Sequence, residues 1–404
     1  MAGLKTAAPK LTALAGPQFR SNPYPFYARL RKEHPVIQVV TPDGHLAWLI
    51  TRYDDALNAL KDKRLSKDIA NLGEKPPWVP KYFEPLARNM LDLDDPDHGR
   101  LRTLVHKAFT PKLIETLRAS IETLSEELIE SAKPHGRMDL IAEFALPLPV
   151  AVISQMLGIP KREQDKFHRW SNAIVSSQSS KVGALKAIPS VISFLRYIRR
   201  LVRLRQVHPE DDLTTALIQA EEAGDRMNAD EMLAMIFLLL IAGHETTVNL
   251  IGNGMLALLT HPEQMERLRG DASLVASAVE EMLRFDSPLE MATERYTTEE
   301  VEFSGTAIPA GARVYAVIAS ANRDEQQFER ADQFDITRPN NRHLSFGMGT
   351  HYCLGAPLAR MEGQIAITAL LKHMPRLRLA LPYNEICWKP GLVLRGVKTL
   401  PVEF

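Results

Sequence analysis

The stretch Phe346-Gly347-Met348-Gly349-Thr350-His351-Tyr352-Cys353-Leu354-Gly355 places one of the chain's two cysteines in a glycine-punctuated loop, and an apolar helical pattern follows from Ala356. The three glycines permit positive φ angles and close approach of the backbone to a large flat group. The free N–H groups at the helix start are expected to lower the pKa of the Cys353 thiol. Cysteine thiolate is one of the few protein groups that hold haem iron. The stretch therefore favours an iron ligand over the usual alternative, a small buried cysteine.

The spacing F-x-x-G-x-x-x-C-x-G resembles the haem-binding loop of the cytochrome P450 family, the haem-thiolate monooxygenases. The resemblance implies that haem (heme b, iron protoporphyrin IX) is bound and that Cys353 is the axial ligand of its iron. It also implies cofactor contacts from the loop residues Phe346, Gly347 and Gly355. His351, two residues before the cysteine, resembles a donor to a haem propionate.

Composition is that of an ordinary globular protein: 404 residues, 45% apolar and 24% charged, with a formal net charge of zero. Nothing in the overall charge indicates nucleic acid. Two cysteines, Cys353 and Cys387, cannot build a disulfide framework, and we expect Cys387 to be buried and structural. The longest apolar run, 233–242, is far short of the roughly 20 residues that span a bilayer. Residues 1–22 look like a loose leader without a signal peptide, so a cytoplasmic protein without a membrane anchor is expected.

Taken in order, the chain is predicted to be mainly α with a small β region. Residues 36–40 and 46–51 are predicted strands around the turn signal Pro42-Asp43-Gly44, and residues 112–224 are mostly helical by their period. No repeat or linker divides the chain, so a single domain over 1–404 is expected. The irregular stretch 67–91 corresponds in the family to the cap of the substrate pocket.

The segment 94–109 is predicted to form a helix, capped by Asp95 or Asp97. His98 and Arg102 lie four residues apart, so they share one face. On spacing alone a solvated helix face explains the pair. The resemblance reverses this interpretation, because H-x-x-x-R at this place binds a haem propionate.

The longest helix is predicted from a capping-box pattern at Asn228 to Thr260. It is apolar nearly all round until Ala242-Gly243-His244-Glu245-Thr246-Thr247, where a buried charge would be costly without a role. Thr246 can bond a backbone carbonyl and open a bulge, and a helix merely kinked by glycine and threonine is the alternative. The segment resembles the family motif A-G-x-[DE]-T. The resemblance implies haem contacts at Ala242 and Gly243 and a proton relay through Glu245 and Thr246.

Glu281 and Arg284 lie at i, i+3 near the end of a predicted helix, a spacing that allows an ion pair but is common on surfaces. In the family E-x-x-R is a buried pair completed by a later arginine, and Arg338 matches that position. The resemblance implies a structural triad that supports the haem loop.

The segment after Ser287-Pro288 passes the haem edge in relatives, where Arg295 reaches a propionate. The resemblance and the apolar character of these segments predict a pocket for a hydrophobic molecule. Its expected lining residues are Trp78, Phe83, Leu239, Leu289, Glu290, Met291 and Leu392.

Together the motifs imply a monooxygenase of secondary metabolism that activates O2 with two external electrons and hydroxylates or epoxidises a hydrophobic small molecule. Electrons would come from NAD(P)H through a ferredoxin or flavodoxin with its reductase. Candidate docking contacts near Cys353 are Arg100, Lys107, Lys112 and Arg360. Two alternatives are a peroxide-driven peroxygenase, whose members generally lack the acid–alcohol pair, and a non-catalytic haem sensor, which needs no proton relay.

Overall fold

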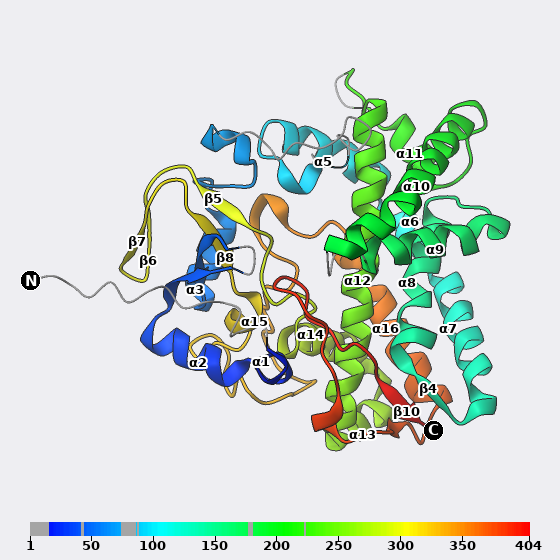
Figure 1. The fold of residues 1–404 in the computed structure, drawn as a ribbon. Coiled ribbons are helices and arrows are strands. Elements are labelled where there is room, and N and C mark those ends of the chain that lie inside the picture. Colours follow the sequence, from blue (N-terminus) through cyan, green and yellow to red (C-terminus); the bar gives the residue numbers. More distant parts are fainter. Residues whose placement is uncertain (1–15, 42–43, 74–85, 87–88, 177–180, 222–223) are drawn as a thin grey trace, which may run out of the picture.

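The computed structural model describes residues 16–41, 44–73, 86, 89–176, 181–221 and 224–404. Figure 1 shows most of the long helices on one side of the molecule and the larger sheet, with α2, α3 and α15, on the other. The predicted fold class, mainly α with a small β region, is confirmed.

The α-helices in the described residues have the following bounds: α1 Pro17–Ser21, α2 Tyr24–Glu33, α3 Tyr53–Lys61, α5 Asp97–Ala108, α6 Pro111–Thr116, α7 Arg118–Ala132, α8 Pro147–Met156, α9 Lys161–Ser176, α10 Lys181–Val207, α11 Leu213–Gln219, α12 Ala229–Thr260, α13 Pro262–Gly270, α14 Val275–Phe285, α15 Ile318–Ala321 and α16 Ala356–His373.

The strands are short and form three sheets in the described residues. They are β1 Val36–Val40, β2 Leu46–Ile50, β3 Leu65–Ser66, β4 Arg137–Asp139, β5 Arg295–Thr297, β6 Val301–Phe303, β7 Thr306–Ile308, β8 Arg313–Ala316, β9 Arg378–Leu379 and β10 Pro401–Glu403. The largest sheet has the order β1-β2-β8-β5-β3, with β2 and β8 parallel and the other pairs antiparallel. The predicted hairpin is β1 and β2, paired from Val36 with Ile50 to Val40 with Leu46.

The long helix α12 begins as predicted. The Asn228 side chain accepts the N–H groups of Asp230 and Glu231 at 2.9 Å each, and the Glu231 carboxylate accepts the Asn228 N–H at 2.9 Å. Among the described residues α12 is the one helix long and apolar enough to cross a membrane, but 56% of its most apolar window is buried inside the protein. It packs against α8, α14 and α16, as a core helix does.

Three apolar clusters hold these layers together. The largest joins the long helices and includes Phe144, Ile251 and Leu370. A second lies beside the five-stranded sheet, and a third packs α2 against β1, β2 and β8.

Three local expectations are corrected. The predicted leader ends in helix α1, where Arg20 is only 4% exposed, whereas residues 1–15 lie outside the described part. Neither Asp95 nor Asp97 caps α5, because the N-cap residue is Pro96 and no side-chain cap forms. Cys387 is exposed rather than buried, since it follows a short turn on the C-terminal segment.

Candidate active site

The loop before α16 depends on two of its glycines. Gly347 and Gly349 have φ values of 69° and 74°, and a Cβ on Gly349 would lie 2.9 Å from the carbonyl oxygen of Leu60. The loop closes on itself through the Cys353 N–H, which donates to the Phe346 carbonyl at 2.9 Å. Gly355 has φ −80°, open to any residue, so its predicted positive φ is wrong.

Cys353 is exposed to solvent, yet its thiol is surrounded by protein atoms. A side chain that lines a recess combines these two properties. Burial raises the pKa of its thiol, and this outweighs the lowering by the N–H groups of Gly355 and Ala356 and by the Arg102 guanidinium. The N–H groups at the helix start therefore lower the pKa as predicted, but they do not offset the effect of burial. Cys353 would be held as thiolate by a bound metal ion, because a coordinating thiol is deprotonated outright.

The middle of α12 presents an unusual surface for a core helix. Ala242 is exposed, and Leu239, Gly243 and Thr246 are half-buried, whereas Leu250, which shares their face by its spacing along the helix, is in the core. The Thr246 hydroxyl donates to the Ala242 carbonyl at 2.8 Å. The helix stays α-helical throughout, so the predicted bulge is absent from this state. An exposed alanine here indicates open space beside the helix.

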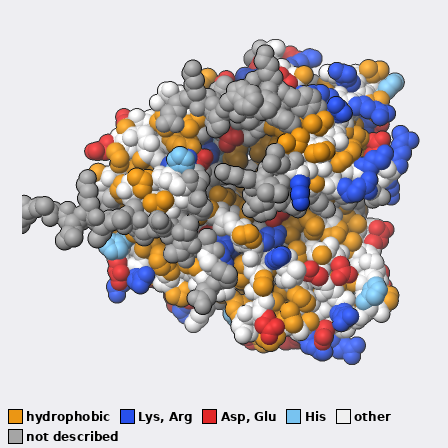
Figure 2. Space-filling model, viewed as in Figure 1, with side chains coloured by type: hydrophobic (Ala, Val, Ile, Leu, Met, Phe, Trp, Pro, Cys, Tyr) orange, Lys and Arg blue, Asp and Glu red, His pale blue; other side chains and the backbone are white. Residues whose placement is uncertain are grey.

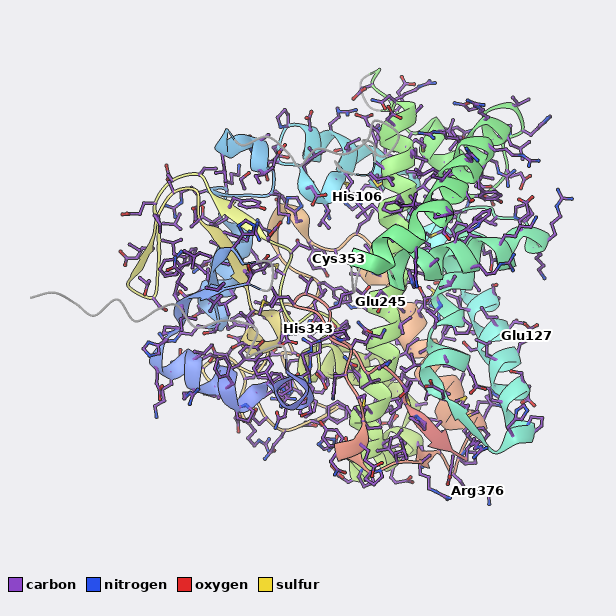
Figure 3. The ribbon with its side chains drawn as sticks, in the orientation of Figure 1. His106, Glu127, Glu245, His343, Cys353 and Arg376 are labelled. Atoms are coloured by element: carbon purple, nitrogen blue, oxygen red, sulfur yellow. The ribbon has the colours of Figure 1, made fainter. Side chains whose placement is uncertain are left out.

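Glu245, which projects from this part of α12, is paired with a residue that the sequence did not suggest. Lys389 Nζ donates to Glu245 Oε1 at 2.7 Å and to Asn249 Oδ1 at 3.2 Å. Figure 3 labels Glu245 and Cys353 close together in that view, beside the centre of α12. The acid is thus held by an ion pair between α12 and the C-terminal segment.

A cluster of cationic and imidazole groups lies beside the Cys353 loop. The His98 ring is 4.1 Å from the His351 ring, and Arg102 Nη2 donates to the Tyr352 carbonyl at 2.6 Å. Among the described residues, His98 Nε2 and Arg295 Nε are buried without a hydrogen-bond partner. Buried donors are normally satisfied, so these two indicate a missing acceptor.

Lys67 joins this cluster, and no local sequence pattern indicated it. Its ammonium group donates to Thr293 Oγ1 at 2.9 Å and to the Glu294 carbonyl at 2.7 Å. Burial and the Arg295 charge lower the pKa of Lys67 to about 8. Burial lowers the pKa of Arg295 to about 10. Burial, together with His98, Arg295 and Lys67, lowers the pKa of His351 to about 3. Burial thus disfavours the charged form of all three groups.

These features fit an iron porphyrin. The exposed Cys353 offers the metal ligand, and the small exposed Ala242 leaves room for a flat ring beside α12. Gly243, predicted to share this contact, packs toward α8 instead, because a Cβ there would lie 2.6 Å from Ile153 Cδ1. The unsatisfied donors and the buried cations suit a pair of carboxylates, which form charge-assisted bonds with such groups. The residues that would hold those carboxylates are His98, Arg102, Arg295, His351 and Lys67.

The triad forms a buried unit near this loop. Glu281 and Arg284 are fully buried, with Arg284 Nε 2.7 Å from Glu281 Oε2. Arg338 Nε is 3.1 Å from the same oxygen, and Asn341 donates to it at 3.0 Å. The arrangement joins α14 to the strand-free segment that leads into the Cys353 loop.

A second ion-pair group changes the interpretation of Arg360. Its Nε and Nη2 donate to the two Glu280 oxygens at 2.6 and 2.8 Å, and it lies 4.4 Å above the Phe346 ring. Burial opposes ionisation, but Arg360 and His343 hold the pKa of Glu280 at about 2. Arg360 is therefore part of the loop scaffold rather than a free docking contact.

Two other candidate docking residues are also engaged. Arg100 pairs with Asp225 at 3.1 Å and with Glu231, and Lys107 donates to the Glu221 carbonyl at 2.7 Å. Lys112 is exposed.

The expected pocket residues separate into three groups. Leu239, Leu289 and Leu392 are half-buried, as residues beside open space are. Trp78 and Phe83 lie outside the described residues. Glu290 and Met291 are only 1% exposed each and belong to the protein interior, so their assignment to the pocket is wrong.

Glu290 is buried because the N-terminal helices cover it. Arg20 Nη1 and the Tyr27 hydroxyl each donate to its carboxylate at 2.5 Å, and Arg395 lies 3.9 Å away. Met291 packs in the apolar cluster around Tyr27. The Glu290 carboxylate thus links α1 and α2 to the C-terminal segment.

Glu362, on α16, is a further buried acid that the sequence did not reveal. It is 2% exposed, and its Oε2 accepts no hydrogen bond from the described residues. Burial raises its pKa to about 8.

Comparison with known proteins agrees with this geometry. The family model described as "Cytochrome P450" matches residues 199–375. The polyketide biosynthesis cytochrome P450 PksS of Bacillus subtilis is 42% identical and covers 96% of this chain and 97% of its own length. Its solved structure superposes with a TM-score of 0.90, covering 96% and 98% of the two chains.

Two other relatives extend the comparison. The cytochrome P450 monooxygenase PikC of Streptomyces venezuelae is 42% identical over 99% of this chain and 95% of its own. A solved structure of P450BioI, in complex with an acyl carrier protein ligated to hexadec-9Z-enoic acid, is 36% identical with a TM-score of 0.85. The match covers 96% of this chain and 99% of that one.

Proposed function

Because this chain belongs to the cytochrome P450 family, we propose that its monooxygenase activity inserts one oxygen atom from O2 into a C–H bond or a double bond of a hydrophobic molecule. The observation that supports this most is the exposed Cys353 sulfur beside a buried group of unsatisfied donors. Haem, when bound, supplies the iron at which O2 is reduced by two electrons.

The chain's own residues bind the cofactor, orient the reacting groups and supply protons. Cys353 holds the metal as thiolate, and the Glu281 triad and the Glu280–Arg360 pair keep its loop in position. Thr246 lies where the α12 face opens, with its hydroxyl on the Ala242 carbonyl. Glu245 moves protons inward to that hydroxyl and is stabilised between transfers by Lys389. A positioned acid of this kind typically contributes a hundredfold or more, by order of magnitude.

The cofactor is heme b, with its propionates held by His98, Arg102, Arg295, His351 and Lys67. Family members of this kind receive electrons from separate redox partners, and here the source is NAD(P)H through a ferredoxin or flavodoxin with its reductase. The protein acts in the cytoplasm, as expected for relatives of this bacterial type.

The substrate belongs to secondary metabolism and carries a long apolar portion. Half-buried leucines at 239, 289 and 392 supply the apolar contacts. One relative acts in polyketide biosynthesis and another was solved with an acylated carrier protein. We infer that the substrate is an acyl or polyketide chain presented on a carrier protein.

The test is spectroscopic. The reduced holoprotein should give the carbonyl difference spectrum of thiolate-ligated haem, and lipophilic acids should shift the iron from low to high spin. Turnover should require NAD(P)H and redox partners. Efficient turnover with peroxide alone would favour the peroxygenase alternative, and haem binding without oxidase activity would favour a sensor.

A further inference from the structure

Charge is distributed unevenly along this neutral chain. Between residues 161 and 207, which span α9 and α10, there are eleven Lys or Arg residues and two acidic residues, although the whole chain has 49 of each kind. The rest of the protein therefore carries a matching acidic excess. Such an imbalance creates a local potential that attracts partners of opposite sign.

Most cations of the two helices whose side chains are described lie on the outer faces. On α10, Arg196, Arg200 and Arg203 are exposed and recur at helical spacing, so they share one face. On α9, Arg162, Lys166 and Arg169 repeat the pattern and are also exposed. These six residues define the α9–α10 basic face. The two helices pack side by side, and Figure 2 shows Lys and Arg side chains gathered over them.

The α9–α10 basic face is not used inside the protein. The described residues form no ion pair with any of its six cations, in contrast to Arg205 on the buried face of α10, which pairs with Asp212 at 2.5 Å. Leu204 and Val207 continue the same face and are 44% and 71% exposed. Cations beside exposed apolar side chains are the composition of a protein docking surface.

The α9–α10 basic face lies away from the Cys353 loop, near which the electron donor is expected to dock. Helices α3, α5 and α14 contact the Cys353 loop region and lie on one side of α12 in Figure 1, while α16 continues from the loop. Helices α9 and α10 pack on the other side of α12. A partner seated there faces the helix whose open middle borders the site, so it is suited to deliver substrate.

We propose that the α9–α10 basic face docks an acidic carrier protein that presents the substrate as a covalently attached chain. This rests on the proposed function and names the partner surface for it. The six cations, which form no ion pair among the described residues, complement an acidic helix surface, and Leu204 and Val207 supply a small apolar contact. A membrane-binding helix would instead need a broad apolar face with aromatic residues, whereas among the described side chains of α10 the exposed large apolar residues are Ile188, Leu204 and Val207.

The experiment measures binding of the haem-loaded full chain to a palmitoyl-charged acyl carrier protein by calorimetry. The test variant is the triple reversal Arg196→Glu, Arg200→Glu and Arg203→Glu. The matched control makes the same charge change at exposed sites elsewhere, Lys372→Glu, Arg376→Glu and Lys398→Glu. We expect the test variant to weaken binding by about tenfold or more, the control to change it little, and added salt to weaken the wild type.

A second triple variant with glutamine at 196, 200 and 203 gives an intermediate loss if the face acts by charge, and it keeps the test valid if the glutamates unfold α10. Equal losses in test and control variants would overturn the proposal, as would unchanged carrier binding. It would also be overturned if anionic phospholipid vesicles bound the face while the carrier did not, or if the test variant lost affinity only for a ferredoxin.

The same preparations separate this proposal from the proposed function. The carbonyl spectrum and the spin shift with free palmitic acid report the haem site without any carrier. A sound haem site without carrier binding overturns the docking surface alone. Carrier binding without a carbonyl signal overturns the monooxygenase and leaves the surface in place.

Discussion

Replacing Glu362 with glutamine should make the protein more stable relative to the wild type as the pH rises, because the wild type loses stability and the variant does not. Glu362 lies on α16 beneath the Cys353 loop, is 2% exposed, and has an Oε2 atom without a hydrogen-bond donor among the described residues. Burial raises its pKa from 4.5 to about 8. The folded protein therefore keeps this acid neutral at neutral pH, while the unfolded chain ionises it.

The magnitude follows from proton linkage. A raised folded-state pKa contributes stability that is fully present below the unfolded value and is lost as the pH rises through the folded value. Between about pH 5 and pH 8 the wild type should lose about 1.4 kcal/mol of unfolding free energy per pH unit through this residue. At pH 7 the loss is about 3 kcal/mol, and near-complete burial leaves no solvent screening to reduce it. Glutamine does not titrate, so Glu362→Gln removes the slope.

Denaturant unfolding of the haem-loaded protein, repeated across this pH range, measures the effect. The informative quantity is the change with pH in the stability difference between Glu362→Gln and wild type, because any packing cost of the amide is constant. Glu127→Gln, an exposed acid on α7 that is labelled in Figure 3, is the matched control and should run parallel to wild type. If the stability of Glu362→Gln changed with pH in parallel with that of the wild type, the reasoning would be refuted. The buried carboxyl would then be ionised or would have a hydrogen-bond donor.

Four further predictions concern the site and its support. Thr246→Ala should retain haem but divert electrons from product to hydrogen peroxide, and unchanged coupling of NAD(P)H use to product would contradict the relay. Cys353→Ser should abolish the thiolate-type carbonyl spectrum, whereas its persistence would place the ligand elsewhere. Lys389→Met should cost about 1 kcal/mol or less and increase peroxide release, because Glu245 loses its 2.7 Å partner; equal peroxide yields would remove Lys389 from the relay. Glu281→Gln should destabilise the fold by about 3–5 kcal/mol in thermal or denaturant unfolding, since two arginines lose a buried partner, and a loss below about 1 kcal/mol would contradict this.

Patterns that are local in sequence predicted the local structure well. The capping box at Asn228 and the continuous apolar run gave the limits of α12, and the turn signal between 40 and 46 gave the β1–β2 hairpin. In each case the residues that determine the conformation are neighbours along the chain, so one window of sequence contains the cause.

Contacts between distant segments were not predictable in this way. Lys389 and Glu245 are 144 residues apart, and Arg20 and Glu290 are 270 apart. No spacing rule connects such pairs, and a lysine or glutamate by itself is most often solvated. Glu290 was assigned to the pocket from its place in the chain, but α1 and α2 bury it, and only the fold reveals that cover.

The net charge of the chain likewise did not predict how charge is arranged in the folded protein. A net charge of zero gave no indication of nucleic acid, but a net charge says nothing of where the charges lie, and it hid a basic helix pair balanced by an acidic remainder. Because α9 and α10 lie together on one side of α12, the imbalance becomes a field with a fixed orientation. An acidic partner is drawn toward that side, whereas Arg100 and Arg360, two of the four candidate docking cations near the Cys353 loop, are engaged in internal ion pairs. The long-range steering therefore acts on the substrate side of the molecule. It follows that raising salt should slow association with an acidic carrier more than it slows binding of a free apolar acid, since screening weakens the field but not the apolar contacts.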